Sequence, residues 1–290
     1  MKTKSILLFG LLSQTPLWAD TLISDNFSDG SRSNRSLPNS AQWFSGGAGA
    51  NTYVTNNSSL AITGLTGSGL GIQGVTTSFE SPGTELSLTV GESLTLSFNY
   101  YYAITSNTDF GFGFGFYNTG GKQVAADGTG FNSALFNGWT GYSAFGIFGG
   151  TDSSSYGRFH LAQRTTTANN LQTPLTTGVL ATTHQTAGLL PNTWYAATLT
   201  LNYATSSSMV LSASIGGETL SVTNTPALSS FDTVVITDGA QAVGTMGVSD
   251  VLVVASPSSV APVPEPSIWA LAGAGCGLLG WARWWRNRGV

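Results

Sequence analysis

Apolar and polar residues alternate with a period of two along most of the chain. The alternation is long and regular in residues 94–102 and 195–203, which predicts two extended strands with one buried side each. Residues 211–215 and 220–222 flank a Gly-Gly pair and predict a hairpin. Further strands are predicted at residues 21–27, 52–54, 60–63, 71–79, 85–90, 142–148, 157–163, 233–237 and 246–254.

Residues 110–116 carry the strictest alternation, in which phenylalanine and glycine exchange at every position. As a strand, this segment directs four phenylalanines into a core and three glycines to the opposite face. The bare backbone of the glycines leaves room for another group to approach closely, either a covering side chain or a ligand.

The fold class follows from the many short strands and their turns. Glycine, asparagine and serine separate the strands, and no long amphipathic helix is predicted between residues 20 and 255. This pattern predicts an all-β protein, an antiparallel β-sandwich or jelly roll. Residues 118–141 and 164–188 lack periodicity and are predicted to be long loops, which are frequently binding loops.

The two ends of the chain have a different composition. Residues 1–19 combine two lysines, a short apolar core and a plausible cleavage point after Ala19, as in a signal peptide. Residues 20–255 are long enough for one large β-sandwich domain, and residues 256–263 form a Ser/Pro linker. The tail, residues 264–288, consists of a Pro264-Glu265-Pro266 motif, an uncharged apolar stretch from Ile268 to Ala282, and a basic end with Arg283, Arg286 and Arg288.

The apolar stretch of the tail is predicted to be a transmembrane helix of minimal length. As a helix it reaches about 22 Å, against about 30 Å for the hydrocarbon core of a bilayer. Trp284 and Trp285 suit the interface that follows it, and the arginines favour the cytoplasmic side. The domain is therefore expected on the far side of the membrane.

The order of Pro-Glu-Pro, apolar helix and arginine cluster resembles the PEP-CTERM sorting signal. The resemblance implies processing by exosortase, a membrane transpeptidase-like enzyme of Gram-negative bacteria that make exopolysaccharide. It implies an exported chain, anchored in the membrane by its C-terminal helix before processing and then delivered to the cell surface or extracellular matrix. The alternative is an ordinary single-span anchor.

The globular part resembles concanavalin-like and laminin-G-like jelly rolls. The resemblance rests on Asp25-Asn26-Phe27-Ser28-Asp29-Gly30 near the start, Asn192-Thr193-Trp194-Tyr195 before a late strand, and Val248-Ser249-Asp250-Val251-Leu252-Val253 at the end. Many members of this class bind carbohydrate, so the resemblance implies a concanavalin-like jelly roll that contacts sugars.

Charge and cysteine content exclude several functions. Charged residues are only 8% of the chain, and 13 of the 14 acidic but 5 of the 10 basic residues lie between Asp20 and Val263, a formal charge of −8. An acidic, lysine-poor surface argues against nucleic acid as a partner. The single cysteine, Cys276, lies in the tail, so the exported domain has neither a disulfide nor a thiol nucleophile.

The residues needed for catalysis are sparse. His160 and His184 are the only histidines, and no Gly-x-Ser-x-Gly elbow is present. Glycoside hydrolysis needs two carboxylates across a cleft. The chain lacks the Glu-x-Asp-x-x-Glu strand that laminarinase-like jelly rolls carry. We therefore expect a protein that is not an enzyme.

Binding candidates come from aromatic and polar residues near turns. Trp139, within Asn-Gly-Trp-Thr-Gly, is expected to be exposed, with Tyr142 beside it, because sugars stack on aromatic rings. Trp194 is expected to pack inside. Arg158 and His160 share the face of their strand opposite Phe159, which is a solvated surface or a ligand-facing one.

A structural calcium is the only cofactor expected from the sequence. Asp25 on the first strand and Asp250 on the last become neighbours if the terminal strands pair, and calcium prefers carboxylate oxygens on turns. The alternative is that such aspartates only form turns.

Together these features predict an exported, non-enzymatic surface or matrix protein that contacts exopolysaccharide. Two alternatives stay open: a secreted polysaccharide-active enzyme, and a purely structural membrane-anchored sandwich.

Overall fold

The computed structural model describes residues 19–46, 52–56, 58–66, 73–104, 111–128, 133–147, 158–165, 178–184, 189–190, 192–238 and 243–257. The contacts between residues divide the chain into two units, Met1–Pro257 and Ser258–Val290. The second unit lies outside the described residues. The predicted signal peptide and transmembrane helix therefore also lie outside them. Within the described ranges, no helix is both long and apolar enough to cross a membrane.

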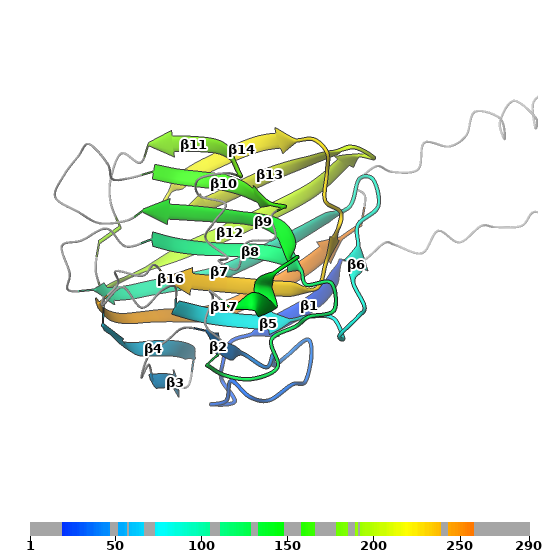
Figure 1. Cartoon of the computed structure of the whole chain (residues 1–290). Helices are drawn as coiled ribbons and strands as arrows, with labels where there is room; N and C mark the ends of the chain where they lie inside the picture. Colours follow the sequence, from blue (N-terminus) through cyan, green and yellow to red (C-terminus); the bar gives the residue numbers. More distant parts are fainter. Residues whose placement is uncertain are drawn as a thin grey trace, which may run out of the picture. The chain divides into compact units, whose positions relative to one another are not determined.

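Two antiparallel sheets form the domain, and Figure 1 shows them stacked face to face. The eight-stranded sheet has the order β14-β13-β12-β7-β17-β4-β3, and β1 pairs with β17 as well. Its strands are β1 (Asp20–Asp25), β3 (Thr52–Asn56), β4 (Ser59–Thr66), β7 (Ser93–Ile104), β12 (Thr193–Thr205), β13 (Ser208–Ile215), β14 (Glu218–Asn224) and β17 (Val243–Ser256).

The seven-stranded sheet has the order β11-β10-β9-β8-β16-β5-β2. Its strands are β2 (Phe44–Gly46), β5 (Gln73–Ser78), β8 (Gly111–Asn118), β9 (Thr140–Ile147), β10 (Arg158–Arg164), β11 (Val179–His184) and β16 (Thr233–Asp238). Two short strands, β6 (Leu86–Ser87) and β15 (Ser230–Phe231), pair with each other, and the 3-10 helix η1 (Ala134–Phe136) precedes β9. The predicted antiparallel β-sandwich is confirmed.

The core lies between the two sheets and follows the alternation of the sequence. Phe98 and Tyr100 of β7 face inward from one sheet, and Phe112 and Phe114 of β8 face them from the other. The rings of Tyr100 and Phe112 stack at 3.8 Å, and those of Phe98 and Phe114 meet edge to face at 5.2 Å. Aromatic contacts of this kind add to the stability gained from apolar burial.

The glycines of β8 do not leave an open groove. A side chain on Gly115 would lie 2.5 Å from the Tyr142 carbonyl oxygen, and one on Gly113 would lie 3.2 Å from the ring of Phe145. Both glycines are buried. The sequence leaves open whether a side chain or a ligand lies over the glycines. In the structure, neighbouring protein groups cover them, because β9 approaches β8 too closely for a ligand to lie there.

One predicted loop contains a strand. Residues 164–188 were expected to be irregular, yet β11 forms within them and pairs with β10 at the edge of the seven-stranded sheet. Its sequence, Val-Leu-Ala-Thr-Thr-His, has no strict alternation because an edge strand is only partly covered. The prediction of an irregular loop was therefore wrong for Val179–His184.

Asp25 at the end of β1 ties the N-terminal segment to the sandwich. Its carboxylate is only 2% exposed and accepts hydrogen bonds from the Phe27 and Ala41 amides at 2.9 and 3.0 Å and from Trp43 Nε1 at 2.9 Å. Three N–H donors compensate a buried carboxylate for the water that it loses.

Replacing Asp25 by alanine should therefore cost about 3 kcal/mol of unfolding free energy or more, because buried donors lose a charged acceptor. Urea unfolding of Asp25→Ala against wild type measures this. The control is Asp250→Asn on the exposed side of the same strand pair, for which we expect a change within about 1 kcal/mol. Equal midpoints for Asp25→Ala and wild type would show that this carboxylate is not a structural anchor.

Candidate functional site

The two aromatic residues expected to stack on sugars are buried. Trp139 is 0% exposed and packs edge to face on Phe136, with ring centroids 4.7 Å apart, while its Nε1 donates to the Lys122 carbonyl. Tyr142 is also 0% exposed. Its hydroxyl accepts hydrogen bonds from the Leu228 amide at 2.8 Å and from Asn224 Nδ2 at 3.1 Å. The exposure predicted for Trp139 was wrong.

The physical reason is a covering segment that the sequence did not reveal. The chain between β8 and β9 folds back over the outer face of the seven-stranded sheet, where Trp139 and Phe136 pack against Tyr117 and Val235. In Figure 1, η1 lies over β16. The buried Arg164 donates to the carbonyl oxygens of Trp139 and Phe136, both at 3.0 Å, and fixes the segment.

His160 lies on the outer face of the seven-stranded sheet, as its alternation predicts. It is half-buried, its Nδ1 lies 2.8 Å from Thr182 Oγ1 of β11, and its ring stacks on Phe145 with centroids 6.4 Å apart. The side chain of Arg158 lies outside the described residues, so the prediction that it shares this face with His160 stays a prediction. The tail residues Pro264, Glu265 and Pro266 also lie outside them.

Asp25 and Asp250 do not form a calcium pair in the structure. The terminal strands do pair, with Asp25 opposite Val251. However, Asp25 shares the buried face of Val251, whereas Asp250 is exposed, so the two carboxylates point to opposite sides of the sheet. Among the described residues, no three His, Cys, Asp or Glu side chains gather as a metal site.

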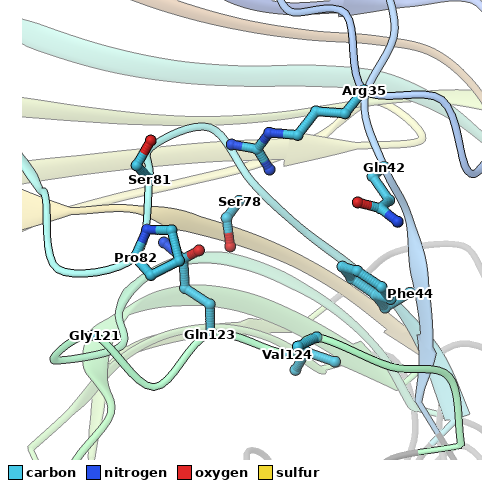
Figure 2. Close-up of a pocket in the computed structure, with 10 residues that line it drawn as sticks. Arg35, Gln42, Phe44, Ser78, Ser81, Pro82, Gly121, Gln123 and Val124 are labelled. Carbon is cyan, nitrogen blue, oxygen red and sulfur yellow. The ribbon is translucent and has the colours of Figure 1, made fainter.

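A pocket that the sequence did not predict opens where three segments meet. It has a volume of about 550 Å³ and lies between the N-terminal segment, the turn after β5 and the turn after β8. Figure 2 shows the Arg35 side chain reaching over it, with Gln42 and Phe44 on one wall and Ser81 and Pro82 on the opposite one. The ten lining residues are Arg35, Gln42, Phe44, Ser78, Ser81, Pro82, Gly121, Gln123, Val124 and Ala125.

A single carbonyl oxygen connects the walls of the pocket. The main-chain oxygen of Glu80 accepts hydrogen bonds from Arg35 Nη2 and from Gln123 Nε2, both at 3.2 Å. Each of these side chains therefore keeps a fixed direction at the mouth. The arginine retains further N–H donors, since a guanidinium carries five and one is engaged with Glu80.

Each turn of the pocket is held by its own contacts. The turn after β8 carries Gly120 and Gly121 at positive φ, which glycine adopts without strain. The buried carboxylate of Asp232 accepts from the Thr119 amide at 3.1 Å and from Thr119 Oγ1 at 2.5 Å. Burial raises the pKa of Asp232, and its hydrogen bonds to Thr119 oppose that rise.

An ion pair joins Asp127, which follows the turn after β8, to Arg32 of the N-terminal segment. Arg32 donates from Nη1 and Nη2 to the two oxygens of Asp127 at 2.9 and 2.7 Å, and the Ser45 amide donates to Asp127 as well. The hydrogen bond from Arg32 lowers the pKa of Asp127 to about 2.

The lining of the pocket allows binding and lacks acid–base groups. It offers one guanidinium, two amides and two hydroxyls beside the rings of Phe44 and Pro82, a mixture that suits a hydroxyl-rich ligand. None of the ten lining residues is a carboxylate, histidine or cysteine. A hydrolytic mechanism by paired carboxylates therefore has no groups to use within this lining.

Residues 262–287 match the PEP-CTERM protein-sorting motif. The chain carries a PEP-CTERM sorting signal. This confirms the resemblance drawn from Pro264-Glu265-Pro266 and the tail that follows it. The signal implies export and anchoring in the membrane before processing. No curated protein sequence matches the chain.

Three solved structures align with this chain over most of its length. An endo-1,3-beta-glucanase from Streptomyces sioyaensis aligns with a TM-score of 0.51 and 14% identity, over 86% of this chain and 100% of that one. The carbohydrate recognition domain of Emp47p aligns with a TM-score of 0.48 and 11% identity, over 84% and 99%. Alginate lyase Aly36B aligns with a TM-score of 0.44 and 11% identity, over 80% and 96%. The likeness to the glucanase establishes the jelly-roll fold, and fold alone does not define activity.

The ion pair of Arg32 and Asp127 should weaken in acid. Because the folded pKa of Asp127 lies below its ordinary value of 3.8, the pair stabilises the fold above about pH 4 and loses that effect as pH falls towards 2. The pair is partly exposed, so we expect Asp127→Asn to cost about 1 kcal/mol near pH 6.

Thermal unfolding of wild type and Asp127→Asn between pH 6 and 2 measures this difference. We expect it to shrink between pH 4 and 2. A difference that stays constant over this range would contradict the role of the ion pair.

Proposed function

We propose that this chain is an exported protein of the cell surface or extracellular matrix whose jelly roll binds polysaccharide without cleaving it. The C-terminal signal supports the location, since exosortase processing would release the domain from its membrane-bound form. The lining of the Arg35 pocket carries the binding part of the proposal.

Arg35 makes an acidic saccharide the preferred ligand of the pocket. Its side chain is exposed, and one donor is engaged with the Glu80 carbonyl. A guanidinium can therefore bind a uronate carboxylate through its remaining donors, in the two-point geometry that arginine prefers. Gln42 and Gln123 supply amides for hydroxyls, and the ring of Phe44 supplies an apolar wall.

The negative charge of the exported region makes Arg35 important for the binding of an anionic ligand. The segment from Asp20 to Val263 has a formal charge of −8. A polyanion is repelled by most of such a surface, so its binding depends on the few exposed cations. Of the five cations in this region, Arg32 pairs with Asp127, Arg164 is buried and Lys122 does not line the pocket. The side chain of Arg158 lies outside the described residues, so Arg35 is the cation that lines the pocket.

The enzyme alternative lacks support in this pocket. Glycosidases hold their two carboxyl groups about 5–9.5 Å apart across the scissile bond. The lining contains neither of them. The nearest acidic residue in sequence, Glu80, contributes its main-chain oxygen to the contacts described above.

Arg35→Ala should weaken the retention of the full chain on a polyuronate at least tenfold. Affinity electrophoresis in gels containing alginate measures it, with gels that contain no polysaccharide as the reference. Lys122→Ala is the matched control, because it removes a cation of the turn after β8 whose side chain does not line the pocket. The control should leave retention within about twofold.

The same samples should release no reducing or unsaturated ends from alginate or from β-1,3-glucan. Equal retention of Arg35→Ala and wild type would overturn the pocket as the site. Release of product by wild type would instead favour the enzyme.

A further inference from the structure

The outer face of the eight-stranded sheet carries hydroxyl side chains in register. Thr219, Ser214, Thr198 and Ser97 lie side by side across β14, β13, β12 and β7, and Ser221, Ser212, Thr200 and Thr95 form the next row. Neighbours in a row are spaced by the strand separation of about 4.8 Å. We name these eight residues the hydroxyl rows.

Members of the hydroxyl rows bond to one another. The hydroxyls of Thr198 and Ser214 are 2.7 Å apart, those of Ser212 and Ser221 2.9 Å, and those of Thr95 and Thr200 3.1 Å. A shallow groove of about 300 Å³ lies between the rows on β12, β13 and β14. The side chains are therefore held in fixed positions on an open surface.

An exposed tryptophan lies on the same face. Trp194 of β12 is 46% exposed, although the sequence predicted that it packs inside. Its neighbour across the strands is Tyr101 of β7, with ring centroids 5.2 Å apart and planes inclined by 37°. The Cη2 atom of Trp194 lies 3.3 Å from the point where a side chain on Gly247 would begin.

Gly247 of β17 thus makes room for the indole ring. Since β7 lies between β12 and β17, the ring reaches across Tyr101's strand and over the backbone of Gly247. A tryptophan that lies along a sheet keeps one ring face towards the outside, which matches its exposed fraction. Such a ring presents a platform for the CH groups of a sugar.

Polar groups in unusual backbone conformations border the platform. Asp250 has φ 51° at an irregularity in the pairing of β17, and Asn192 has φ 61° before β12. Asn99 Nδ2 and Ser249 Oγ donate to Asp250 Oδ2 at 2.9 and 3.0 Å. The Tyr101 hydroxyl donates to Asn192 at 3.0 Å. Non-glycine residues in this region are frequently tied to function.

We propose that these residues form a second carbohydrate-binding surface, which we name the Trp194 face: Asn99, Tyr101, Asn192, Trp194, Asp250 and the hydroxyl rows. Trp194 stacks on a sugar ring, while the carboxylate of Asp250 and the amide of Asn99 bond to its hydroxyls. The hydroxyl rows continue this polar surface for about 20 Å along β12, from Trp194 to Thr200.

The charge of the face selects the class of glycan. Asp250 is the only charged residue among the outward-facing positions of β7, β12, β13, β14 and β17 that the structure describes. A carboxylate beside the stacking ring repels a uronate and accepts hydrogen bonds from a neutral sugar. The ligand is therefore a neutral glycan chain, in contrast to the acidic one proposed for the Arg35 pocket.

Two such surfaces give the domain a bridging role. The Trp194 face belongs to the eight-stranded sheet, whereas Phe44 and Ser78 in the Arg35 pocket belong to the seven-stranded one. A single chain can therefore hold a neutral and an acidic polysaccharide at once. This consequence rests on the proposed function of the pocket, but the neutral glycan surface stands without it.

The test is retention of the full chain in gels containing laminarin, a neutral β-glucan, or dextran. Trp194→Ala should reduce retention at least tenfold on any of these glucans that retards wild type. Gly247→Val should do so too, because its side chain lifts the indole from the sheet. Val90→Ala, which removes an apolar side chain that is 51% exposed in a turn, is the matched control and should leave retention within twofold.

Arg35→Ala separates the two proposals, since it should lower retention on alginate and leave retention on the neutral glucan unchanged. The second surface is overturned if Trp194→Ala binds as wild type does, or if neither glucan retards wild type. It is also overturned if sedimentation shows a dimer of wild type that Trp194→Ala converts to a monomer, because a second copy would then occupy the face. Unfolding curves of the variants exclude loss of the fold as the cause.

Discussion

The packing of the β7 side chains against the phenylalanines of β8 joins the two sheets. Tyr100 on Phe112 and Phe98 on Phe114 fill the space between the layers, where the alternation of both strands directs them. The exported region has no cysteine, so no disulfide supports this interface. Apolar burial must therefore provide most of the stability. The outer face of the eight-stranded sheet remains available for other groups, whereas the segment between β8 and β9 covers part of the outer face of the seven-stranded sheet.

Period-two alternation predicted the sandwich because burial between two sheets imposes it. Residues 94–102 and 195–203 became β7 and β12, whose inward residues are those that the pattern indicated. Burial of the tryptophans was predicted the wrong way round. Trp139 and Trp194 both lie beside polar turns, and long-range packing decides their exposure. The segment that carries Trp139 packs onto the outer face of the seven-stranded sheet, whereas Gly247 leaves room for Trp194 on the outer face of the other sheet. Such long-range contacts leave no local pattern.

The Arg35 pocket could not be assembled from the sequence for a related reason. Its residues come from three segments that are far apart in the chain and meet only through the pairing of β2, β5, β8 and β16. One feature of the sequence did point to Arg35. The exported region contains only five basic residues, so each of them is unusual. The residues of the sorting signal, in contrast, are contiguous in the chain, so the signal could be recognised from the sequence alone.

Both binding surfaces matter only if the domain reaches a polysaccharide outside the membrane. The most direct test is the C-terminus of the mature chain, determined by mass spectrometry after expression in a host with and without exosortase. The account predicts loss of the segment that follows Pro264-Glu265-Pro266 only where exosortase is present. An intact Val290 terminus in the membrane fraction of both hosts would contradict it.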